Sequence, residues 1–401
     1  MSNAAASSLA QPSGQVPFAS YESVRGVLGS QAAVMIDLRA PAEYADDAIP
    51  GAINVPLFED VTRSFVGLLY KQFSPEAAFQ EGRAAVAERV EGLVAEIAAH
   101  AGWTVPKDDL KARVLAMTDG GIAKMEAELT PTAVASLPDA PVILHCARGG
   151  MRSRSVVALL RALGFDRAVG LNGGYRGYRR DVMQSLSDWT APPRVIALRG
   201  LTGVGKTLVL RAIEGLRPGW TLDLEGLAGH RSSLLGMVGL KPVSQRAFET
   251  AMSARIAAGF PDGVMVIEGE SRKVGDAIIP GPMWEALRSA TNVDVTASIP
   301  RRVTVLSEDY LRDESALPIL RQQLVAVAER MDGDPPLAEM LDRGEIGPLV
   351  ELLLERYYDP LYRRSDQGKR YACTVEAEDE HAAADEIVRA IESGQLAPWS
   401  K

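Results

Sequence analysis

The chain of 401 residues is long enough for two or three domains, and 47% hydrophobic with 24% charged residues is an ordinary globular balance. Its formal net charge of -9 argues against a broad basic surface that coats nucleic acid without sequence preference. Two cysteines, Cys146 and Cys373, are too few for a disulfide scaffold and are typical of a reducing compartment. The sequence shows neither a bilayer-spanning apolar run nor a signal-peptide pattern, so we expect a cytoplasmic protein with no membrane partner.

The first region alternates short apolar strands with helices after a polar tail. We expect a flexible tail over residues 1–15, followed by these elements: a strand at 34–38, a turn at 50–52, a helix at 75–100, a strand at 141–145, a helix at 155–163 and a strand at 168–171. Between about 60 and 140 the pattern is mainly helical, which predicts an insertion. Strands that alternate with helices imply a parallel α/β sheet, so residues 16–188 are expected to form one domain.

A proline-rich joint, Thr190-Ala191-Pro192-Pro193, precedes a second series of strands and helices. The expected elements are a strand at 195–198, a glycine-rich loop with a helix, a central strand at 264–268, a helical segment at about 303–364, a strand at 371–375 and a helix at 379–393. The pattern therefore predicts a second parallel α/β domain over residues 194–401, with helical additions toward the C-terminus.

A cysteine at the end of a buried strand is the first candidate site. Cys146 is followed by Ala147-Arg148-Gly149-Gly150-Met151-Arg152 and then by a helix that begins near Ser153. Such a loop turns backbone N–H groups inward, and with the helix N-terminus it binds an anion and lowers the pKa of the thiol. Arg148 and Arg152 can add charged hydrogen bonds. We predict Cys146, Arg148 and Arg152 as catalytic residues; the alternative is an inert buried cysteine.

Two known cysteine chemistries compete for this loop. His145-Cys146, five residues and then Arg152-Ser153 match the signature of protein tyrosine phosphatases, in which Cys146 would attack phosphate and Arg152 would hold it. The upstream stretches 36–39, 43–44 and 49–56 resemble instead the opening of rhodanese domains, whose cysteine carries sulfur or selenium. The chain departs from rhodaneses by Ala48, where most have histidine, and by a cysteine loop that is one residue longer. These departures weigh against simple thiosulfate:cyanide transfer, and we interpret His145 as a strand-end residue.

A complete phosphate-binding motif is the second candidate site. Gly200-Leu201-Thr202-Gly203-Val204-Gly205-Lys206-Thr207 fits the Walker A pattern between an expected strand and an expected helix. In such a P-loop the backbone N–H groups surround phosphate oxygens, the lysine reaches the outer phosphates and the threonine can ligate magnesium. The predicted phosphate-binding residues are Gly200, Gly203, Val204, Gly205, Lys206 and Thr207, with a magnesium ion expected at Thr207.

Polar residues after two strands are candidates for contact with the substrate or with a metal. The stretch 223–231 is expected to be a loop at the mouth of the P-loop sheet, and 268–272 follows the central strand. The candidates are Asp223, Glu225, His230, Arg231, Glu268, Glu270 and Arg272. An ATPase would usually have aspartate at the end of that central strand. Glu268 or Glu270 holds a metal in one interpretation and is a polar strand end without catalytic duty in the other.

Several stretches along the chain together resemble one family, the tRNA 2-selenouridine synthases. They follow the family order and span most of the chain: 37–43, 70–72, 146–153, 173–175, the P-loop, 223–228 with His230-Arg231, 268–272 and 357–362. A rhodanese-type loop followed by a P-loop is a specific combination. The resemblance implies a rhodanese-like parallel-sheet domain followed by a P-loop NTPase-like α/β domain. The segment 101–141 is longer than the family suggests.

The resemblance implies two steps on the wobble uridine of tRNA. In the first, geranyl diphosphate alkylates the sulfur of 2-thiouridine and pyrophosphate leaves. In the second, selenophosphate supplies the selenium that replaces the geranylated sulfur, and Cys146 acts in this step. The expected partners are tRNA and small phosphate or diphosphate substrates, and no tightly bound cofactor is expected. Basic clusters are candidates for RNA binding, although each could equally be a solvated face: Arg176, Arg179 and Arg180, and Arg363, Arg364, Lys369 and Arg370. A pair at Arg301 and Arg302 has the same two interpretations.

Two other classes of function remain open at the level of sequence. One is a P-loop ATPase or kinase with a phosphatase-like or sulfurtransferase cysteine domain. The other is a nucleotide-binding module without enzymatic activity. Turnover of ATP would favour the first, and an unreactive Cys146 would favour the second.

Overall fold

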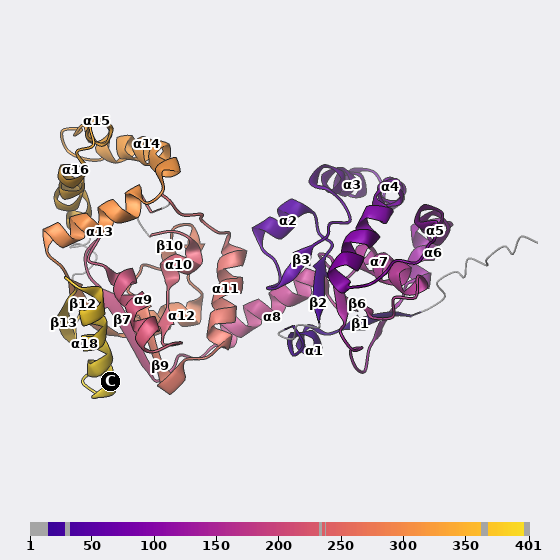
Figure 1. The fold of residues 1–401 in the computed structure, drawn as a ribbon, viewed down its shortest axis with the longest axis horizontal. Helices are drawn as coiled ribbons and strands as arrows, with labels where there is room; N and C mark the ends of the chain where they lie inside the picture. The colour runs from indigo at the N-terminus through magenta and orange to yellow at the C-terminus, as the bar shows by residue number, and fades with distance from the viewer. Residues whose placement is uncertain (1–14, 29–32, 232–234, 237, 362–367, 397–401) are drawn as a thin grey trace, which may run out of the picture. The chain divides into compact units, whose positions relative to one another are not determined.

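The computed structural model describes residues 15–28, 33–231, 235–236, 238–361 and 368–396. The chain divides into two compact units, Met1–Val182 and Met183–Lys401, and the boundary along the chain falls within helix α8 (Gly174–Asp188) (Figure 1). The proline-rich joint at 190–193 has no helix or strand and lies between α8 and strand β7 (Arg194–Arg199). Among the described helices, none is long and apolar enough to cross a membrane.

The first unit is built on a six-stranded sheet in the order β3-β2-β5-β6-β1-β4. Every neighbouring pair of strands is parallel. The strands are β1 (Val16–Ala19), β2 (Val34–Asp37), β3 (Ala52–Asn54), β4 (Pro131–Ala133), β5 (Val142–His145) and β6 (Ala168–Leu171). All residues of β5 and β6 are buried, which explains why these central strands are continuous apolar runs in the sequence.

Helices cover this sheet and connect its strands. They are α1 (Tyr21–Arg25), α2 (Pro41–Asp46), α3 (Asp60–Gln72), α4 (Pro75–Ala101), α5 (Leu110–Met117), α6 (Gly121–Glu128) and α7 (Met151–Ala162). Helix α4 begins at Ser74, whose side chain accepts a hydrogen bond from the Ala77 N–H, and ends at Gly102 in the left-handed conformation. Its buried residues recur at helical spacing, with Val90, Val94 and Ile97 inside one core with β2, β5 and α7.

The insertion between β3 and β5 is helical through α6 and then contributes an edge strand. β4 pairs in parallel with β1, placing Val16 opposite Pro131. The sequence pattern predicts neither β1 nor β4. Strand β4 in particular has only three residues, begins with Pro131 and has no buried position. The long segment at 101–141 is therefore part of the sheet as well as of the helical insertion.

The second unit has a five-stranded parallel sheet in the order β13-β12-β7-β9-β8. The remaining strands are β8 (Thr221–Leu222), β9 (Val264–Glu268), β12 (Thr291–Thr296) and β13 (Cys373–Glu376), and a separate antiparallel hairpin joins β10 (Lys273–Val274) to β11 (Ala277–Ile278). Helices α9 (Lys206–Leu216) and α18 (Glu380–Glu392) pack together against the sheet in one core (Figure 1). Helix α10 (Leu224–Ala228) follows β8. Helix α11 (Gln245–Ala257) and a short 3-10 turn, Pro261–Gly263, lead into β9, and helix α12 (Gly281–Arg288) leads into β12.

A helical subdomain follows β12 and has an apolar core of its own. Its members are α13 (Ile299–Leu311), a 3-10 turn (Glu314–Ala316), α14 (Leu317–Ala328), α15 (Leu337–Asp342), α16 (Ile346–Leu353) and a π-helical turn (Leu354–Tyr358). The predicted helical segment at 303–364 covers this part of the chain, and its residues 362–364 lie outside the described residues. Leu306 of α13 belongs to this core and also lies against the P-loop, where a Cβ on Gly203 would come within 2.9 Å of it. The subdomain therefore supports one side of the P-loop.

Two local predictions need correction. The stretch 223–231 was expected to be a loop, but it contains α10, because the Asp223 side chain accepts the Gly226 N–H and starts a helix. Arg302 was a candidate for a solvated basic face, but it is buried. Its guanidinium forms an ion pair with Asp359 at 2.5 Å and donates to the Thr202 carbonyl at 2.9 Å. A buried arginine of this kind needs partners that a sequence pattern does not reveal.

Candidate functional site

The cysteine loop is held by close backbone packing. Cys146 follows β5 directly, and its carbonyl accepts a hydrogen bond from the Tyr175 N–H at 3.0 Å, where α8 begins. Gly149 has a φ of +64°, and a Cβ there would lie 2.8 Å from the Leu171 carbonyl oxygen. Gly174 is equally confined, since its Cβ would lie 2.2 Å from the Cys146 carbonyl oxygen. Both positions require glycine, and they fix the loop between β5, β6 and the start of α8.

The loop makes the cysteine more acidic than an ordinary thiol. The Cys146 Sγ lies 3.3 Å from the Ser153 hydroxyl and is buried at the N-terminus of α7. Burial alone raises the pKa of the thiol, but the Arg152 guanidinium, the Ser153 hydroxyl and the backbone N–H groups of Arg148 and Ser153 outweigh it and lower the pKa. The lowered pKa favours the thiolate form of Cys146 relative to an ordinary thiol. The Arg148 side chain is exposed, so its contribution to the thiol comes from its backbone.

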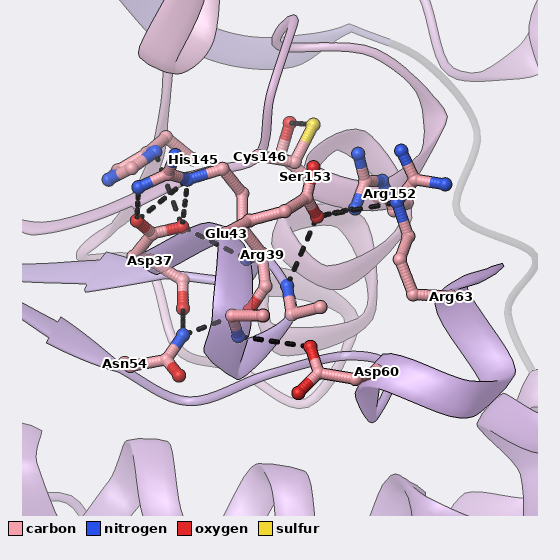
Figure 2. A network of polar contacts seen from close by, with 12 residues as sticks. Asp37, Arg39, Glu43, Asn54, Asp60, Arg63, His145, Cys146, Arg152 and Ser153 are labelled. Atoms are coloured by element: carbon pink, nitrogen blue, oxygen red, sulfur yellow. Dashed lines mark hydrogen bonds and ion pairs between the residues drawn. The ribbon is translucent and has the colours of Figure 1, made fainter. Parts of the chain in front are cut away.

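A buried polar network lies beside the loop at the ends of β2 and β5 (Figure 2). Arg39 forms a bidentate pair with Asp37, with Nη2–Oδ2 at 2.6 Å, and donates to the Asp47 carbonyl at 2.7 Å. The Tyr175 hydroxyl donates to the Asp47 carboxylate at 2.7 Å, and the Arg39 guanidinium lies 3.7 Å from the centre of the Tyr175 ring. The network ties the ends of the strands to α8 and so keeps the cysteine loop in place.

His145 precedes the cysteine but is inaccessible as a proton carrier. Its ring is fully buried, and Nδ1 lies 3.7 Å from Asp37 Oδ1. Within the described part of the chain, neither ring nitrogen makes a hydrogen bond. Burial lowers the pKa of His145 to about 4, and the Asp37 carboxylate only partly opposes this shift. The imidazole is therefore neutral at physiological pH, as suits a strand-end residue.

A carboxylate and two guanidinium groups lie at the mouth of the cysteine loop (Figure 2). Glu43 of α2 forms an ion pair with Arg152 of α7 at 3.6 Å and with Arg63 of α3 at 3.3 Å. The start of α2 is also joined to α3, because the Ala42 N–H donates to Asp60 at 2.9 Å. The prediction of Arg152 as a catalytic residue stays untested. Its guanidinium lies at ion-pair distance from Glu43, and its charge lowers the pKa of the Cys146 thiol.

The P-loop runs from the end of β7 to the start of α9. Gly200, Gly203 and Gly205 all have positive φ values, and a Cβ on Gly200 would lie 2.1 Å from the Val295 carbonyl oxygen. The Lys206 ammonium donates to the carbonyl oxygens of Gly200 at 3.0 Å and Leu201 at 3.3 Å. Val204 is buried and anchors the loop in the core. The predicted phosphate-binding residues thus form one glycine-rich turn at the N-terminus of a helix, the arrangement that binds phosphate.

Carboxylates from helix α10 and from the end of β9 meet at Thr207. Its hydroxyl lies 2.6 Å from Glu268 Oε1 and 3.2 Å from Glu225 Oε2, and the Glu225 N–H donates to Glu268 at 3.2 Å. Burial raises the pKa of Glu225 to about 8, with Glu270 adding to the shift and Lys206 opposing it. Burial and the Glu225 charge likewise raise the pKa of Glu268 well above its ordinary value. A hydroxyl has one proton to donate, so two ionised carboxylates cannot both be satisfied here.

The other candidates around the P-loop divide into two groups. Asp223 and Glu270 are close enough to raise the pKa of Glu268, although Asp223 also caps α10. His230, Arg231 and Arg272 have different environments. His230 packs against the hairpin turn, where a Cβ on Gly275 would lie 2.5 Å from its ring. Arg231 forms an ion pair with Asp309 at 3.5 Å and donates to the Val238 carbonyl, while Arg272 is exposed.

The basic clusters proposed for RNA are only partly accessible. Arg176 and Arg180 of α8 are exposed, whereas Arg179 forms an ion pair with the buried Asp47 at 3.8 Å. Arg370 is exposed and Lys369 is half-buried. Arg363 and Arg364 lie outside the described residues, so that their prediction cannot be compared with the structure.

Sequence reasoning missed the roles of several residues that define these sites. Glu43, Asp37 and Arg39 lie in stretches that resemble the family, yet the pattern does not say what they contact. Arg63 lies in no such stretch, and Arg302 was interpreted as a surface residue. One signal in the sequence could have indicated a polar network here: Glu43 lies close in sequence to the charged residues Asp37 and Arg39. Burying charged side chains beside a strand costs free energy unless they are paired, so such a group is expected to form ion pairs.

The two units thus define a class of protein in which a cysteine loop with a lowered thiol pKa and a P-loop occur in one α/β chain. A family model described as the tRNA 2-selenouridine synthase AAA domain matches residues 193–333. A tRNA 2-selenouridine synthase of Cupriavidus necator is 30% identical over 82% of this chain and 87% of the relative, and one of Pseudomonas syringae pv. syringae is 30% identical over 84% and 89%. One of Nitrosomonas europaea is 27% identical over 84% and 90%. The chain belongs to the tRNA 2-selenouridine synthase family.

Proposed function

We propose that this enzyme exchanges the sulfur of a wobble 2-thiouridine in tRNA for selenium through an S-geranylated intermediate. The observation that carries the proposal is the pairing of two distinct anion sites, an acidic thiol and a P-loop, in a chain that matches named tRNA 2-selenouridine synthases over most of its length. Two successive steps with different phosphate-bearing substrates need two such sites.

The P-loop suits the alkylation step. The thiocarbonyl sulfur of 2-thiouridine attacks C1 of geranyl diphosphate, a carbon–sulfur bond forms, the carbon–oxygen bond breaks, and pyrophosphate and the N3 proton are released. The leaving group gathers negative charge on its oxygens. Lys206 and the backbone N–H groups at the start of α9 supply fixed positive potential for that charge. We therefore assign the diphosphate of geranyl diphosphate to the P-loop.

Residues beside the P-loop fit a magnesium ion. Thr207 and Glu268 present oxygen atoms 2.6 Å apart, and burial together with neighbouring carboxylates raises the pKa values of Glu225 and Glu268, which supports a cation at this place. Among the described residues, no group of three or more histidine, cysteine or carboxylate side chains is arranged to hold a metal by itself. Magnesium at a P-loop takes further ligands from phosphate and water, so this protein set is sufficient. When bound, the ion would neutralise charge on the diphosphate.

The cysteine loop suits the selenium step. Selenium from selenophosphate adds to C2 of the alkylated base, geranylthiol leaves, and hydrolysis of the selenium–phosphorus bond releases phosphate. The alkylated sulfur leaves more readily than a thiocarbonyl sulfur, which explains the order of the steps. Arg152 and the loop N–H groups would bind the phosphate of the donor, and the Cys146 thiolate acts in this step.

Mass spectrometry of the wobble nucleoside separates the two steps. Lys206→Ala should leave 2-thiouridine unmodified, because pyrophosphate has lost its main cation. Cys146→Ala should convert 2-thiouridine to the geranylated nucleoside and stop there. Intact geranylation in Lys206→Ala, or ATP hydrolysis without tRNA, would contradict the assignment of the P-loop and favour an ATPase. Loss of both steps in Cys146→Ala would contradict the assignment of the cysteine.

The exposed arginines of α8 support a weaker proposal about RNA. Arg176 and Arg180 lie one turn apart on the helix whose first backbone N–H groups hold the cysteine loop. We propose that they contact tRNA phosphates, as does the exposed Arg370 of the second unit. Charge reversal at Arg176 and Arg180 should weaken tRNA binding and reduce its salt dependence. Unchanged binding and salt dependence would exclude this cluster.

A further inference from the structure

In the network at the mouth of the cysteine loop, the Glu43 carboxylate faces the guanidinium groups of both Arg152 and Arg63 (Figure 2). One of its oxygens, Oε2, lies 3.6 Å from Arg152 Nη1 and 3.3 Å from Arg63 Nε, and accepts the Ala40 N–H at 3.3 Å. Three donors from α2, α3 and α7 therefore share a single carboxylate oxygen. This contrasts with the nearby Asp37–Arg39 pair, whose hydrogen bonds include one of 2.6 Å.

The Glu43 contacts are long for charged hydrogen bonds, at 3.3 Å to Arg63 and 3.6 Å to Arg152. Charged N–H···O bonds are usually about 2.7–2.9 Å long. Among the described residues, Arg152 Nη1 is buried and has no hydrogen-bond partner. A buried guanidinium nitrogen without a hydrogen bond is costly, and the charge of the same guanidinium lowers the pKa of the Cys146 thiol. Glu43 therefore leaves Arg152 only partly satisfied.

We propose that Glu43 takes the place of a phosphate group at the mouth of the cysteine loop, and that a phosphate-bearing ligand binds Arg152 and Arg63 and releases Glu43. A phosphate offers several oxygens in a tetrahedral arrangement, so it can accept from both guanidinium groups at once, whereas Glu43 serves them through one atom. The inference rests on the proposed function for its choice of ligand, which is the phosphate of the selenium donor or a phosphate of the tRNA backbone. Arg63 thereby becomes a binding residue contributed by α3.

Exchange of this kind requires that Arg63 can turn toward a ligand, and its place on α3 allows this. None of the residues of α3, all of which are described, is buried, and Val61, Phe65 and Leu68 are exposed along one face. The helix packs along α4 and is joined to α2 by the Ala42–Asp60 hydrogen bond. Because the Arg63 side chain is 35% exposed, it can turn toward a ligand while the packing of α3 on α4 is kept.

Protection of Cys146 from alkylation tests the exchange without selenium or prenyl chemistry. Iodoacetamide would be used on the full chain in a Cys373→Ser background, with inorganic phosphate as the protecting ligand. In Glu43→Gln the competing charge is gone but the shape and the Ala40 hydrogen bond remain. We expect phosphate to protect at about three- to tenfold lower concentration, and the pH profile of alkylation to move to lower pH. Arg63→Gln should weaken protection in either background.

Glu59→Gln is the matched control. Glu59 is a 59% exposed carboxylate of the same unit that pairs with Arg89 at 3.7 Å. It should change neither protection nor the pH profile. A thermal melt of each variant separates loss of folding from loss of binding. The proposal is overturned if Glu43→Gln behaves like Glu59→Gln, or if its alkylation profile moves to higher pH, which would mean that Glu43 only orients Arg152.

A second arm distinguishes the two sources of phosphate. An anticodon stem-loop RNA that carries 2-thiouridine is titrated against the same variants at several salt concentrations. If the site takes a backbone phosphate, Glu43→Gln strengthens RNA binding and Arg63→Gln lowers its salt dependence. If it takes the donor, only protection by free phosphate changes. Either result supports phosphate exchange, and neither depends on catalysis, so failure of the proposed function would show separately in the nucleoside assay.

Discussion

The cysteine loop and the P-loop are both anion sites between a parallel strand and a helix, but their side chains create opposite charge balances. At the cysteine loop two guanidinium groups face one carboxylate, and the pKa of the Cys146 thiol is lowered. At the P-loop Glu225 and Glu268 meet at Thr207, and the pKa values of both carboxylates are raised. The first site is prepared for an anion alone. The second site already holds two carboxylates, so a highly charged anion would bind there best together with a cation.

The difference shows that a strand–loop–helix backbone does not determine which ligand binds. Backbone N–H groups supply a similar cradle in both units, while the side chains around it set the charge that the ligand must bring. For the cysteine loop this is a phosphate near a thiolate. For the P-loop it is a diphosphate with magnesium, as proposed above. The predictions below change one side of this comparison at a time.

Glu268→Gln should have the largest effect, because it removes the negative charge that would hold magnesium while keeping the contact with Thr207. Loss of metal-dependent stabilisation of a leaving group typically costs about 10²–10³ in rate. We expect a loss of that order in geranylation at saturating magnesium, measured by formation of the geranylated nucleoside. Glu285→Gln, an exposed carboxylate of the same unit, is the control. A rate independent of magnesium in the wild type would contradict the charge comparison itself.

Each site is also supported by a buried arginine–aspartate pair, Asp37–Arg39 beside the cysteine loop and Arg302–Asp359 beside the P-loop. Removal of one partner leaves the other charge buried. Asp359→Ala should therefore lower the free energy of unfolding of the second unit by about 3–5 kcal/mol, measured by chemical denaturation. The double variant Arg302→Met/Asp359→Leu should recover much of this loss. If the single and the double variant are equally destabilised, the packing of the two side chains, and not their charge, accounts for the loss of stability.

Sequence reasoning predicted the framework of both sites because their signals are local. Each of these signals is contained in a few neighbouring residues: the apolar runs of β5 and β9, the glycines of the P-loop, and the start of the helix that follows Cys146. The family resemblance is confirmed by relatives that match most of the chain. The same locality explains the misreading of 223–231, since the short α10 depends on a single capping aspartate.

The charge balance could not be predicted, because it depends on contacts between distant segments. Glu43 meets Arg152 across more than a hundred residues, and Arg302 meets Asp359 across 57. Glu225 and Glu268 come together only because β8 and β9 are neighbours in the sheet. A sequence pattern places each residue at the end of an element. It does not show which element ends are adjacent.

Glu225→Gln should change how stability depends on pH. The folded-state pKa of Glu225 is about 8, against an ordinary value of 4.5, so the folded state retains a proton that the unfolded chain releases in this window. Without magnesium, the wild type should therefore lose stability as pH rises from 4.5 toward 8, by a few kcal/mol in all. The variant should melt several degrees higher than the wild type at pH 8.5 and at about the same temperature near pH 5.

Added magnesium gives the matching control for that pH dependence. The ion would bind the ionised carboxylates, so it should raise the melting temperature of the wild type at pH 8.5 and have less effect on Glu225→Gln. If the melting temperatures of the wild type and Glu225→Gln differ by the same amount at every pH, the pKa of Glu225 is not raised by folding. The contrast in charge between the two sites would then be lost.

Arg152→Gln should have the smallest effect of these substitutions, but the direction of its effect on the pH profile of Cys146 alkylation is the clearest. Arg152 lowers the pKa of Cys146, so its removal should move the alkylation profile to higher pH and slow the reaction with iodoacetamide at pH 7 several-fold. Glu43→Gln should move the same profile the other way, because it removes the charge that offsets Arg152. Two substitutions of neighbouring residues with opposite shifts cannot arise from general loosening of the loop. If both variants slow alkylation, the thiolate depends on the geometry of the pair, and the cysteine loop is not the charge-prepared site that the comparison requires.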